Sequence, residues 1–240
     1  MKQRLDQKLV ALQLVPTRSQ AESYIKLGDV KLNGKVETKP GTIVREDDHV
    51  ELTAKEQYVS RAALKLASVA KVLHIDFEGK TILDVGSSTG GFTDYALKHG
   101  VVKSIAVEVG TNQLHPSLHG DPRIELHEQT DIRGFVTDQK IDIVVADVSF
   151  ISLREILPHV TTLAHKDTQI VAMVKPQFEA AVSSLKHKGV IKNDRMRRDI
   201  LKDFETWAST AFRIVDKADS QVSGSKGNVE RFYLLKILQR

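Results

Sequence analysis

The sequence contains no cysteine among its 240 residues. Without thiols the chain cannot form disulfides, a zinc ribbon, an iron–sulfur cluster or a cysteine nucleophile. No apolar stretch approaches the ~18 residues of a membrane-spanning helix. The first ten residues also contain no apolar signal-peptide segment. We therefore expect a cytoplasmic protein with no membrane partner and no metal centre.

What the chain does contain is charge, and it is distributed unevenly. Lys and Arg exceed Asp and Glu by 35 to 31 overall, but by nine to four through Arg45 and by seven to two over residues 186–202. Either patch alone is explained by a solvated surface. Two patches in one modest chain favour an anionic partner, for which phosphate backbones are the commonest source. At about 150 residues per domain, the length favours one medium domain and one small domain.

The first 54 residues read as a small α+β unit. Apolar residues recur at helical spacing from Leu5, Pro16 ends that helix, and Thr17 can cap a second helix that ends at Gly28. The pattern then alternates around Asn33-Gly34, which is a strong hairpin signal. We expect two helices and a small hairpin sheet in residues 1–54, followed by a linker at 55–59.

This segment, "RLDQKLVALQLVPTRSQAESYIKLGDVKLNGK", resembles the S4-type RNA-binding domain, named after a small-subunit ribosomal protein. The resemblance implies that the second helix and the hairpin form an RNA-binding face. One face that follows the phosphates is geometrically reasonable. The alternative is that its residues only solvate a small hairpin. The residues concerned are Arg4, Arg18, Ser19, Lys26, Lys31, Asn33 and Lys35.

From residue 60 to 240 we expect a second domain with an α/β fold. Ser60 is placed to cap an amphipathic helix, "RAALKLASVAKVL". Apolar runs such as "TILDVG", "IDIVVADVSF" and "QIVAMVKP" then alternate with helical segments, and several are too continuous for half-exposed strands. The pattern predicts a doubly wound sheet of buried parallel strands covered by helices.

The first strand of this sheet leads into a Gly-rich turn, "DVGSSTGGFTD", which alone does not distinguish a dinucleotide from S-adenosylmethionine. Asp84 would sit inside the turn and repel a pyrophosphate, whereas it would favour the ammonium and sulfonium of S-adenosylmethionine. Glu108, at the end of the next strand, is spaced to bind ribose hydroxyls. Asp131 could accept from the adenine amino group, but capping a loop is the alternative. The alternatives are that Asp84 only caps a helix and that Glu108 is only a solvated residue at the end of a strand.

The sequence therefore predicts a Rossmann-like sheet of the class I S-adenosylmethionine methyltransferases. The predicted cofactor-binding residues are Asp84, Gly86, Ser87, Ser88, Thr89, Gly90, Gly91, Phe92, Glu108, Val109, Asp131, Ile132 and Asp147.

The residues that the chain lacks limit the choice of the atom that receives the methyl group. Pyrimidine ring-carbon methylation commonly needs a cysteine, and the fourth strand ends "ADVSF" without the prolines typical of base-amine methyltransferases. Ribose 2′-OH remains the most plausible nucleophile, and it needs a base. Lysine can serve when burial and a second cation favour its neutral form. The candidate residues are Lys65, Asp147, Lys175 and Glu230.

Five segments, "YVSRAALKL", "DVGSSTGGFTD", "VVADVSFISL", "VKPQFE" and "KGNVERFYLL", resemble the hemolysin A family of ribosomal RNA cytidine 2′-O-methyltransferases, whose catalytic domain is FtsJ-like. The resemblance spans essentially the whole chain and implies ribosomal RNA or ribosomal subunits as partners. It implies Lys175 as the base, Asp147 and Glu230 as residues that position it, and Lys65 as the residue that orients the ribose.

The chain departs from the expected family pattern at Asp131, where an Asn is expected, and in the linker "KEQY", where a tryptophan is expected. Both departures leave the adenine contact and any coupling through the linker open. The basic stretch after the Lys175 motif could hold RNA through Lys188, Lys192, Arg195 and Arg198. Two other functions stay open: a membrane-active hemolysin, and an RNA-binding protein with a vestigial methyltransferase domain.

Overall fold

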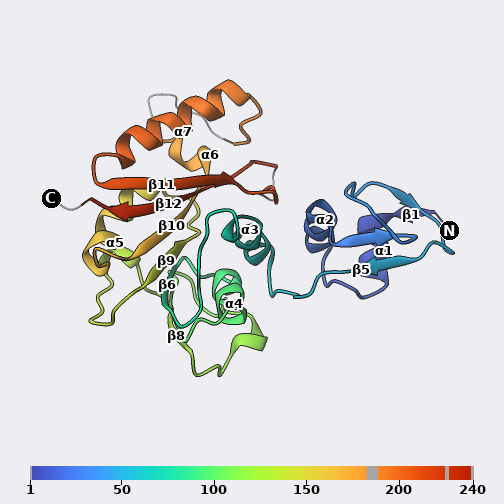
Figure 1. The fold of residues 1–240 in the computed structure, drawn as a ribbon, viewed down its shortest axis with the longest axis horizontal. Coiled ribbons are helices and arrows are strands. Elements are labelled where there is room, and N and C mark those ends of the chain that lie inside the picture. The colour runs from blue at the N-terminus through green and yellow to red at the C-terminus, as the bar shows by residue number, and fades with distance from the viewer. Residues whose placement is uncertain (1, 183–188, 225–226, 239–240) are drawn as a thin grey trace.

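The computed structural model describes residues 2–182, 189–224 and 227–238, which form two lobes (Figure 1). The small lobe contains two helices, a three-stranded antiparallel sheet of order β3-β2-β5, and a two-stranded sheet that pairs β1 with β4. Its elements are β1 (Gln3–Arg4), α1 (Leu5–Ala11), α2 (Arg18–Leu27), β2 (Val30–Leu32), β3 (Lys35–Val36), β4 (Ile43–Val44) and β5 (Val50–Leu52).

The local signals in the small lobe act as expected. The Thr17 hydroxyl accepts a hydrogen bond from Gln20 N at 3.2 Å and caps α2. Gly28 ends α2 in the left-handed conformation that glycine adopts without strain. Asn33 and Gly34 both have positive φ, as the tight turn between β2 and β3 requires. The prediction of two helices and a hairpin sheet is confirmed.

The large lobe contains a seven-stranded sheet of order β11-β12-β10-β9-β6-β7-β8. Its strands are β6 (Thr81–Val85), β7 (Lys103–Val107), β8 (Ile124–His127), β9 (Ile143–Ala146), β10 (Gln169–Val174), β11 (Phe212–Asp219) and β12 (Arg231–Ile237). The predicted doubly wound sheet of parallel strands is confirmed, with the exception of β12, which lies antiparallel between β10 and β11. Residues 220–230, which join β11 to β12, are too few for the crossover that a parallel neighbour needs.

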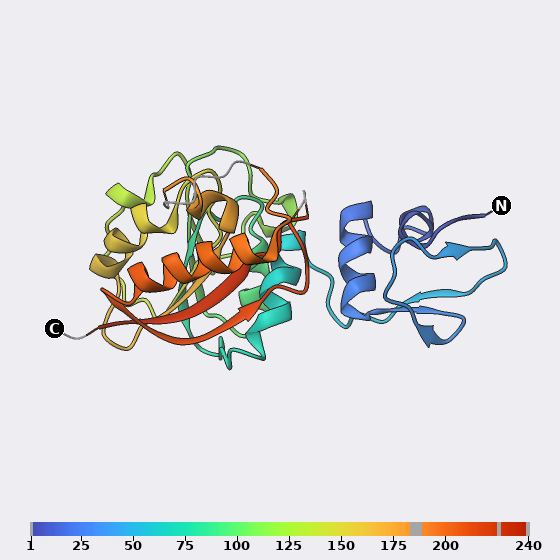
Figure 2. The same ribbon diagram turned by 90° about the horizontal axis from the view of Figure 1, so that it is seen from above.

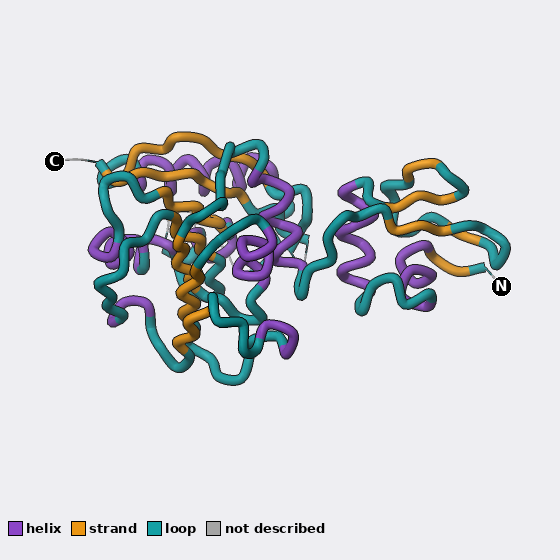
Figure 3. The backbone as a smooth tube through the Cα atoms, turned by 60° about the horizontal axis from the view of Figure 1, so that its bottom comes forward, coloured by secondary structure: helices purple, strands orange, loops and turns teal. Residues whose placement is uncertain are grey.

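Helices cover both faces of this sheet (Figure 3). Ile82 of β6 points to the face covered by α3 (Arg61–Ala70) and α4 (Gly91–Lys98), and the next residue, Leu83, points to the opposite face. That second face is covered by α5 (Leu157–Leu163) and α7 (Asp194–Ala208). Because both faces are buried, the strands carry continuous apolar runs, as the sequence predicts.

Short helical segments lie in the connections. They are η1 (Pro116–Leu118), η2 (Ile132–Gly134), η3 (Leu153–Glu155) and α6 (Pro176–Glu179). The strand order reverses between β6 and β9, and ligands of open α/β sheets bind beyond the carboxyl ends of the strands at such a point.

The two lobes also share apolar packing. Leu64 of α3 and Val222 join the buried cluster that fills the small lobe. Helix α2 is the small-lobe element that faces the large lobe (Figure 2). Among the described residues, no helix has both the length and the apolar character needed to cross a membrane.

Candidate active site

The Gly-rich turn after β6 brings the ends of β6 and β9 into contact. Gly86 has a φ of +77°, and a Cβ there would lie 3.0 Å from the carbonyl oxygen of Asp147. At Gly91, the first residue of α4, a Cβ would lie 2.2 Å from the Ser60 hydroxyl. Glycine at these two positions therefore allows β9 and the start of α3 to approach the turn closely.

Two adjoining cavities open at this edge of the sheet. The first, of about 430 Å³, lies between the turn, the start of α3 and residues Thr17, Ser19 and Gln20 of the small lobe. The second, of about 540 Å³, lies between the ends of β6, β7 and β9. Of the predicted cofactor residues, only Gly90 and Gly91 line neither. The first cavity is lined by Asp84, Gly86, Ser87, Ser88, Thr89, Phe92 and Asp147, and the second by Gly86, Ser88, Glu108, Val109, Asp131, Ile132 and Asp147.

Asp84 was predicted to lie inside the turn, but it is the fourth residue of β6 and is fully buried. Its Oδ2 accepts hydrogen bonds from Thr93 N at 3.0 Å and Thr93 Oγ1 at 2.7 Å, so one oxygen caps α4. Its Oδ1 has no hydrogen-bond partner among the described residues. Burial raises the pKa of Asp84 to about 7, although the bonds from Thr93 oppose the shift. Helix capping therefore uses only one of the two oxygens of this carboxylate.

Glu108 is buried rather than a solvated strand end. Its Oε2 accepts from Ser88 N at 2.9 Å, and its Oε1 accepts from Gly110 N at 2.7 Å. These bonds fix the carboxylate at the wall of the second cavity, beside the Gly-rich turn. Its position is the one predicted for a residue that binds ribose hydroxyls.

Asp131 stands at the same cavity but is already engaged. It accepts from Arg133 N at 2.9 Å, which caps η2, and it pairs with the Arg133 guanidinium at 2.6 Å. These hydrogen bonds lower the pKa of Asp131 to about 2. The loop-capping alternative is thus realised, and an adenine amino group would compete with Arg133 for this carboxylate.

The four candidate catalytic side chains form two ion pairs. Lys175, directly after β10, lies 2.6 Å from Asp147 Oδ1, directly after β9. Lys65 of α3 lies 3.0 Å from Glu230 Oε1, directly before β12. Glu230 was expected to position Lys175, but the side chain that it binds is Lys65. Lys65, Lys175 and Asp147 line the first cavity.

Both pairs are poorly exposed. Lys65 is 7 %, Lys175 9 % and Glu230 2 % exposed, so Lys65 is not a solvated helix residue. Burial raises the pKa of Glu230, Lys65 lowers it, and the charges of Asp147 and Lys175 also act on it. The two pairs therefore lie within electrostatic range of one another.

Three polar or aromatic residues at this site were not predicted as site residues from the sequence. Lys175 donates a hydrogen bond to Ser149 Oγ at 2.6 Å. Phe150 is 92 % exposed and has a positive φ, and its ring lies 5.4 Å from that of Phe178. Ser60 directly precedes α3, and the prediction that it caps this helix is wrong, because its side chain makes no capping hydrogen bond. Its buried hydroxyl has no partner among the described residues. The available signal for Ser149 was its spacing of two residues from Asp147, which places both on one side of an extended segment.

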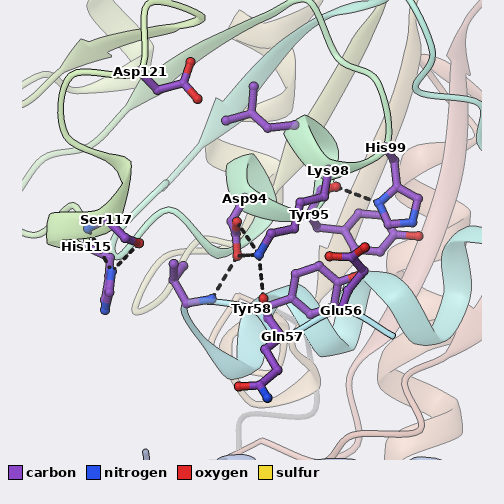
Figure 4. Close-up of polar contacts among 12 residues, drawn as sticks. Glu56, Gln57, Tyr58, Asp94, Tyr95, Lys98, His99, His115, Ser117 and Asp121 are labelled. Atoms are coloured by element: carbon purple, nitrogen blue, oxygen red, sulfur yellow. Dashed lines mark hydrogen bonds and ion pairs between the residues drawn. The ribbon is translucent and has the colours of Figure 1, made fainter. Parts of the chain in front are cut away.

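The linker between the lobes is held from both sides (Figure 4). Val59 N donates to Asp94 of α4 at 2.9 Å, and Lys98 pairs with Asp94 and lies over the Tyr58 ring. From the small lobe, Gln20 donates to the Tyr58 carbonyl oxygen at 3.0 Å. Tyr58 thus supplies an aromatic ring in the linker that was expected to carry a tryptophan.

The predicted RNA-binding residues differ in how free they are. Arg4 and Arg18 both pair with the buried Asp6, and the Asn33 side chain binds Asp48 and His49 N. No ion pair within the described part of the chain involves Lys26, Lys31 or Lys35, nor Lys192, Arg195 or Arg198 on the second patch, and Ser19 is exposed. Lys188 lies outside the described residues.

Arg197, in the same basic stretch, has a structural contact instead. It pairs with Asp219 at 2.6 Å and donates to the Val229 carbonyl oxygen, next to Glu230. Part of the second patch therefore holds the β11–β12 connection rather than facing a partner.

Comparisons with known proteins agree with this geometry. Residues 58–237 match the FtsJ-like methyltransferase family and residues 3–50 match the S4 domain. The 16S/23S rRNA (cytidine-2′-O)-methyltransferase TlyA of Mycobacterium tuberculosis is 36% identical over 97% of this chain and 89% of its own length. Hemolysin A of Brachyspira hyodysenteriae is 36% identical over 95% of this chain and 97% of its own.

Solved structures give the same result. A Streptococcus thermophilus protein described as a hemolysin superposes with a TM-score of 0.72 at 33% identity, covering 99% of this chain and 89% of that one. An S-adenosylmethionine-dependent methyltransferase from Listeria monocytogenes, at 15% identity and a TM-score of 0.55, covers 74% of this chain and 99% of its own and shares the fold alone. The chain belongs to the FtsJ-like methyltransferase family, carries an S4 domain, and within that family is a member of the group that includes TlyA and hemolysin A.

Proposed function

We propose that this enzyme transfers a methyl group from S-adenosylmethionine to the ribose 2′-OH of a cytidine in ribosomal RNA, with Lys175 as the base. The observation that carries the proposal is the joint placement of Lys175, Asp147 and Ser149 at one cavity with the Gly-rich turn. Relatives from M. tuberculosis and Campylobacter jejuni, the latter 42% identical over 74% of this chain and 70% of its own length, are named as rRNA (cytidine-2′-O)-methyltransferases.

The residues around the first cavity fit this cofactor. Asp84 Oδ1 is a buried acceptor without a partner in the described chain, as a bound ammonium requires. The hydroxyls of Ser60 and Ser87 are likewise buried without partners there and can donate to a carboxylate. In the second cavity, Glu108 would hold the ribose hydroxyls of the cofactor, with Val109 and Ile132 beside its adenine ring. When bound, the cofactor supplies a methyl group activated by its sulfonium.

The chain's own residues handle the proton. A neutral Lys175 Nζ would accept the proton of the 2′-OH as that oxygen takes the methyl group, while the bond from the methyl carbon to the sulfonium sulfur would break and leave its electron pair on sulfur. Asp147, 2.6 Å away, stabilises the ammonium that results. Glu230 holds Lys65 at 3.0 Å, and Lys65 then orients the ribose.

RNA would reach the site from the small lobe. Lys26, Lys31 and Lys35, which have no ion-pair partner among the described residues, offer cations to phosphates, with Arg18, Ser19 and Asn33 beside them. Phe150, exposed next to Ser149, offers a ring on which an unstacked base can stack. Residues 1–54 would form the docking domain, 55–59 the linker and 60–240 the catalytic domain. We place this activity in the cytoplasm, where ribosomal RNA is found.

The test is Lys175→Ala in a single-turnover assay with labelled cofactor. Loss of the base is expected to slow transfer by at least about 100-fold, while calorimetry shows cofactor binding within about threefold of wild type. Lys140→Ala, which changes an exposed lysine that precedes β9 and belongs to neither basic patch, is the matched control. Retained transfer by Lys175→Ala would contradict the role of the base.

Two measurements separate the alternatives. No heat of binding with S-adenosylmethionine would favour an RNA-binding protein with a vestigial domain. Leakage of liposomes on addition of the purified protein would favour a membrane-active hemolysin. We expect cofactor binding and no leakage.

A further inference from the structure

The contacts around Lys175 depend on two irregular segments. Asp147 and Ser149 follow the last residue of β9, Ala146, and Lys175 follows the last residue of β10, Val174. Asp147 N donates to the Val85 carbonyl oxygen of β6 at 3.1 Å, which ties Asp147 to that strand. The pairing of β9 with β10 ends at Ala146 and Ala172, however, so the hydrogen bonds between these two strands do not by themselves set the distance from Lys175 to its two partners. Other contacts must hold the segments in register.

Glu179 supplies such a contact. It is the last residue of α6, four residues after Lys175, and is 1 % exposed. Its Oε2 accepts from Ser152 Oγ at 2.7 Å, and its Oε1 accepts from Leu153 N at 2.9 Å. One carboxylate from the segment after β10 therefore binds the end of the segment that carries Asp147 and Ser149.

The surrounding groups make this contact rigid. Arg154 Nε lies 3.3 Å from Glu179 Oε2, and its Nη2 lies 2.7 Å from Asp203 of α7. Ser152 Oγ also accepts from Arg154 N at 3.1 Å, so the same hydroxyl caps η3. Burial raises the pKa of Glu179, while these donors oppose the shift. A buried carboxylate is costly, and packing alone does not call for one at this position.

A second link joins the same two segments nearer to the cavity. The Phe178 ring, one residue before Glu179, lies 5.4 Å from the Phe150 ring and has Lys175 Nζ 5.9 Å from its centroid. The position of α6 is therefore coupled to Lys175 and Phe150 together.

We propose that Glu179 is a positioning residue that sets the distance between Lys175 and its partners Asp147 and Ser149, and so sets the rate of methyl transfer without touching cofactor or RNA. The inference rests on the proposed function for its activity readout. It assigns a role to the acidic residue of the "KPQFE" motif outside the four candidate catalytic residues.

The direct test is Glu179→Gln. An amide keeps the size of the side chain but presents an NH₂ group to one of its donors, and neither Leu153 N nor Arg154 Nε can accept from it. The single-turnover rate is expected to fall by about 10- to 100-fold, because small errors in the position of reacting groups cost that much. Affinity for cofactor and RNA should stay within about twofold of wild type. Glu205→Gln, which changes a carboxylate of α7 that binds Lys217 and Tyr233 rather than any group around Glu179, is the control and should keep the wild-type rate.

Two outcomes would overturn the inference. One is a Glu179→Gln variant with the wild-type single-turnover rate. The other is a parallel loss of thermal stability and both affinities with an unchanged rate for the folded fraction, which would mean a structural role only. If Glu179→Gln does not fold, Ser152→Ala removes one donor and should lower the rate by a smaller factor at unchanged affinity, and an unchanged rate would again refute the role. Failure of the proposed function is distinguishable, because the wild-type protein itself would then methylate no ribose.

Discussion

At the scale of single residues, the site contains more buried charge than folding alone explains. Lys65, Lys175 and Glu230 are each less than a tenth exposed. Ion pairs in such places seldom stabilise a protein more than apolar residues of the same size would. Charged groups that are retained at a cavity therefore indicate binding or catalysis rather than stability.

The raised pKa of Asp84 predicts how the stability of the protein changes with pH. Its pKa is about 7 in the folded protein against 3.8 as the ordinary value. The protonated form is thus favoured by folding, and the contribution of Asp84 to stability is lost as the pH rises toward and through 7. Without cofactor, Asp84→Asn should melt several degrees higher than wild type at pH 8 and nearly level with it at pH 4. Calorimetric melting at both pH values measures this.

Asp121 provides a control of opposite sign. Arg123 lowers the pKa of Asp121, so Asp121→Asn should lose a little stability at pH 8 rather than gain it. The proposed role of Asp84 adds that Asp84→Asn binds S-adenosylmethionine at least about tenfold more weakly. A variant that is stabilised and still binds normally would show that the carboxylate serves only the helix cap.

Residue types and motif spacing were enough to predict both ion pairs' members, but not their surroundings. The sequence pattern of this helix gives no sign that Lys65 is buried against Glu230, as it is in the fold. The Glu lies 165 residues away along the chain, so no local pattern contains the contact. Ser60 was predicted as a cap from its position, but it makes no capping hydrogen bond and lines the first cavity, which exists only where the turn, α3 and the small lobe come together.

At the scale of elements, the site depends on the close approach of α3 and α4. A Cβ on Gly91 would lie 2.9 Å from Ala62 Cβ and 3.0 Å from Ala63 N, besides the Ser60 hydroxyl. Backbone cannot move aside as the end of a long side chain can. The start of α4 is therefore sealed against the start of α3, with the Gly-rich turn between them.

Gly91→Ala should consequently destabilise the protein by about 1–3 kcal/mol, the usual cost of overpacking. Gly134→Ala is the control, since a Cβ at Gly134 has no atom within 4 Å and its φ is not positive. Denaturant unfolding of both variants checks the prediction. Equal stability of the two would show that α3 can shift without cost.

Two features of the strands could not be predicted from the sequence pattern. The apolar runs predicted the strands of the sheet because those strands are buried on both faces. They could not predict that β12 inserts antiparallel between β10 and β11, since burial looks the same in either direction. The pairing of β1 with β4 was missed because two-residue strands carry no alternation.

At the scale of the whole molecule, the small lobe borders the site itself. Thr17, Ser19 and Gln20 line the same cavity as Lys175, and Arg18, Ser19 and Lys26 line a neighbouring one with Arg61. RNA held by the S4 domain would therefore enter the catalytic cavity from α2. The resemblance predicted both domains, and the packing of α2 toward α3 follows only from the fold.

The salt dependence of RNA binding tests this arrangement. Replacing Lys26, Lys31 and Lys35 together by Ala should reduce the slope of log K against log salt by about 2–3, because each lost phosphate contact removes about 0.7–0.9. Cofactor affinity should not change. Lys140→Ala, whose exposed lysine lies before β9 at the opposite edge of the sheet, should leave the slope unaltered. An unchanged slope for the triple variant would mean that these three lysines do not contact phosphates and that the RNA-binding face lies elsewhere.

The central claim is ribose methylation by a lysine base, and mapping the product tests it most directly. Ribosomal subunits and free ribosomal RNA are incubated with methyl-labelled S-adenosylmethionine, digested to nucleosides and analysed by mass spectrometry. The account predicts label in 2′-O-methylcytidine with the wild-type protein and none with Lys175→Ala. Label on a base atom, label on the ribose of another nucleoside, or equal label with both proteins would contradict it.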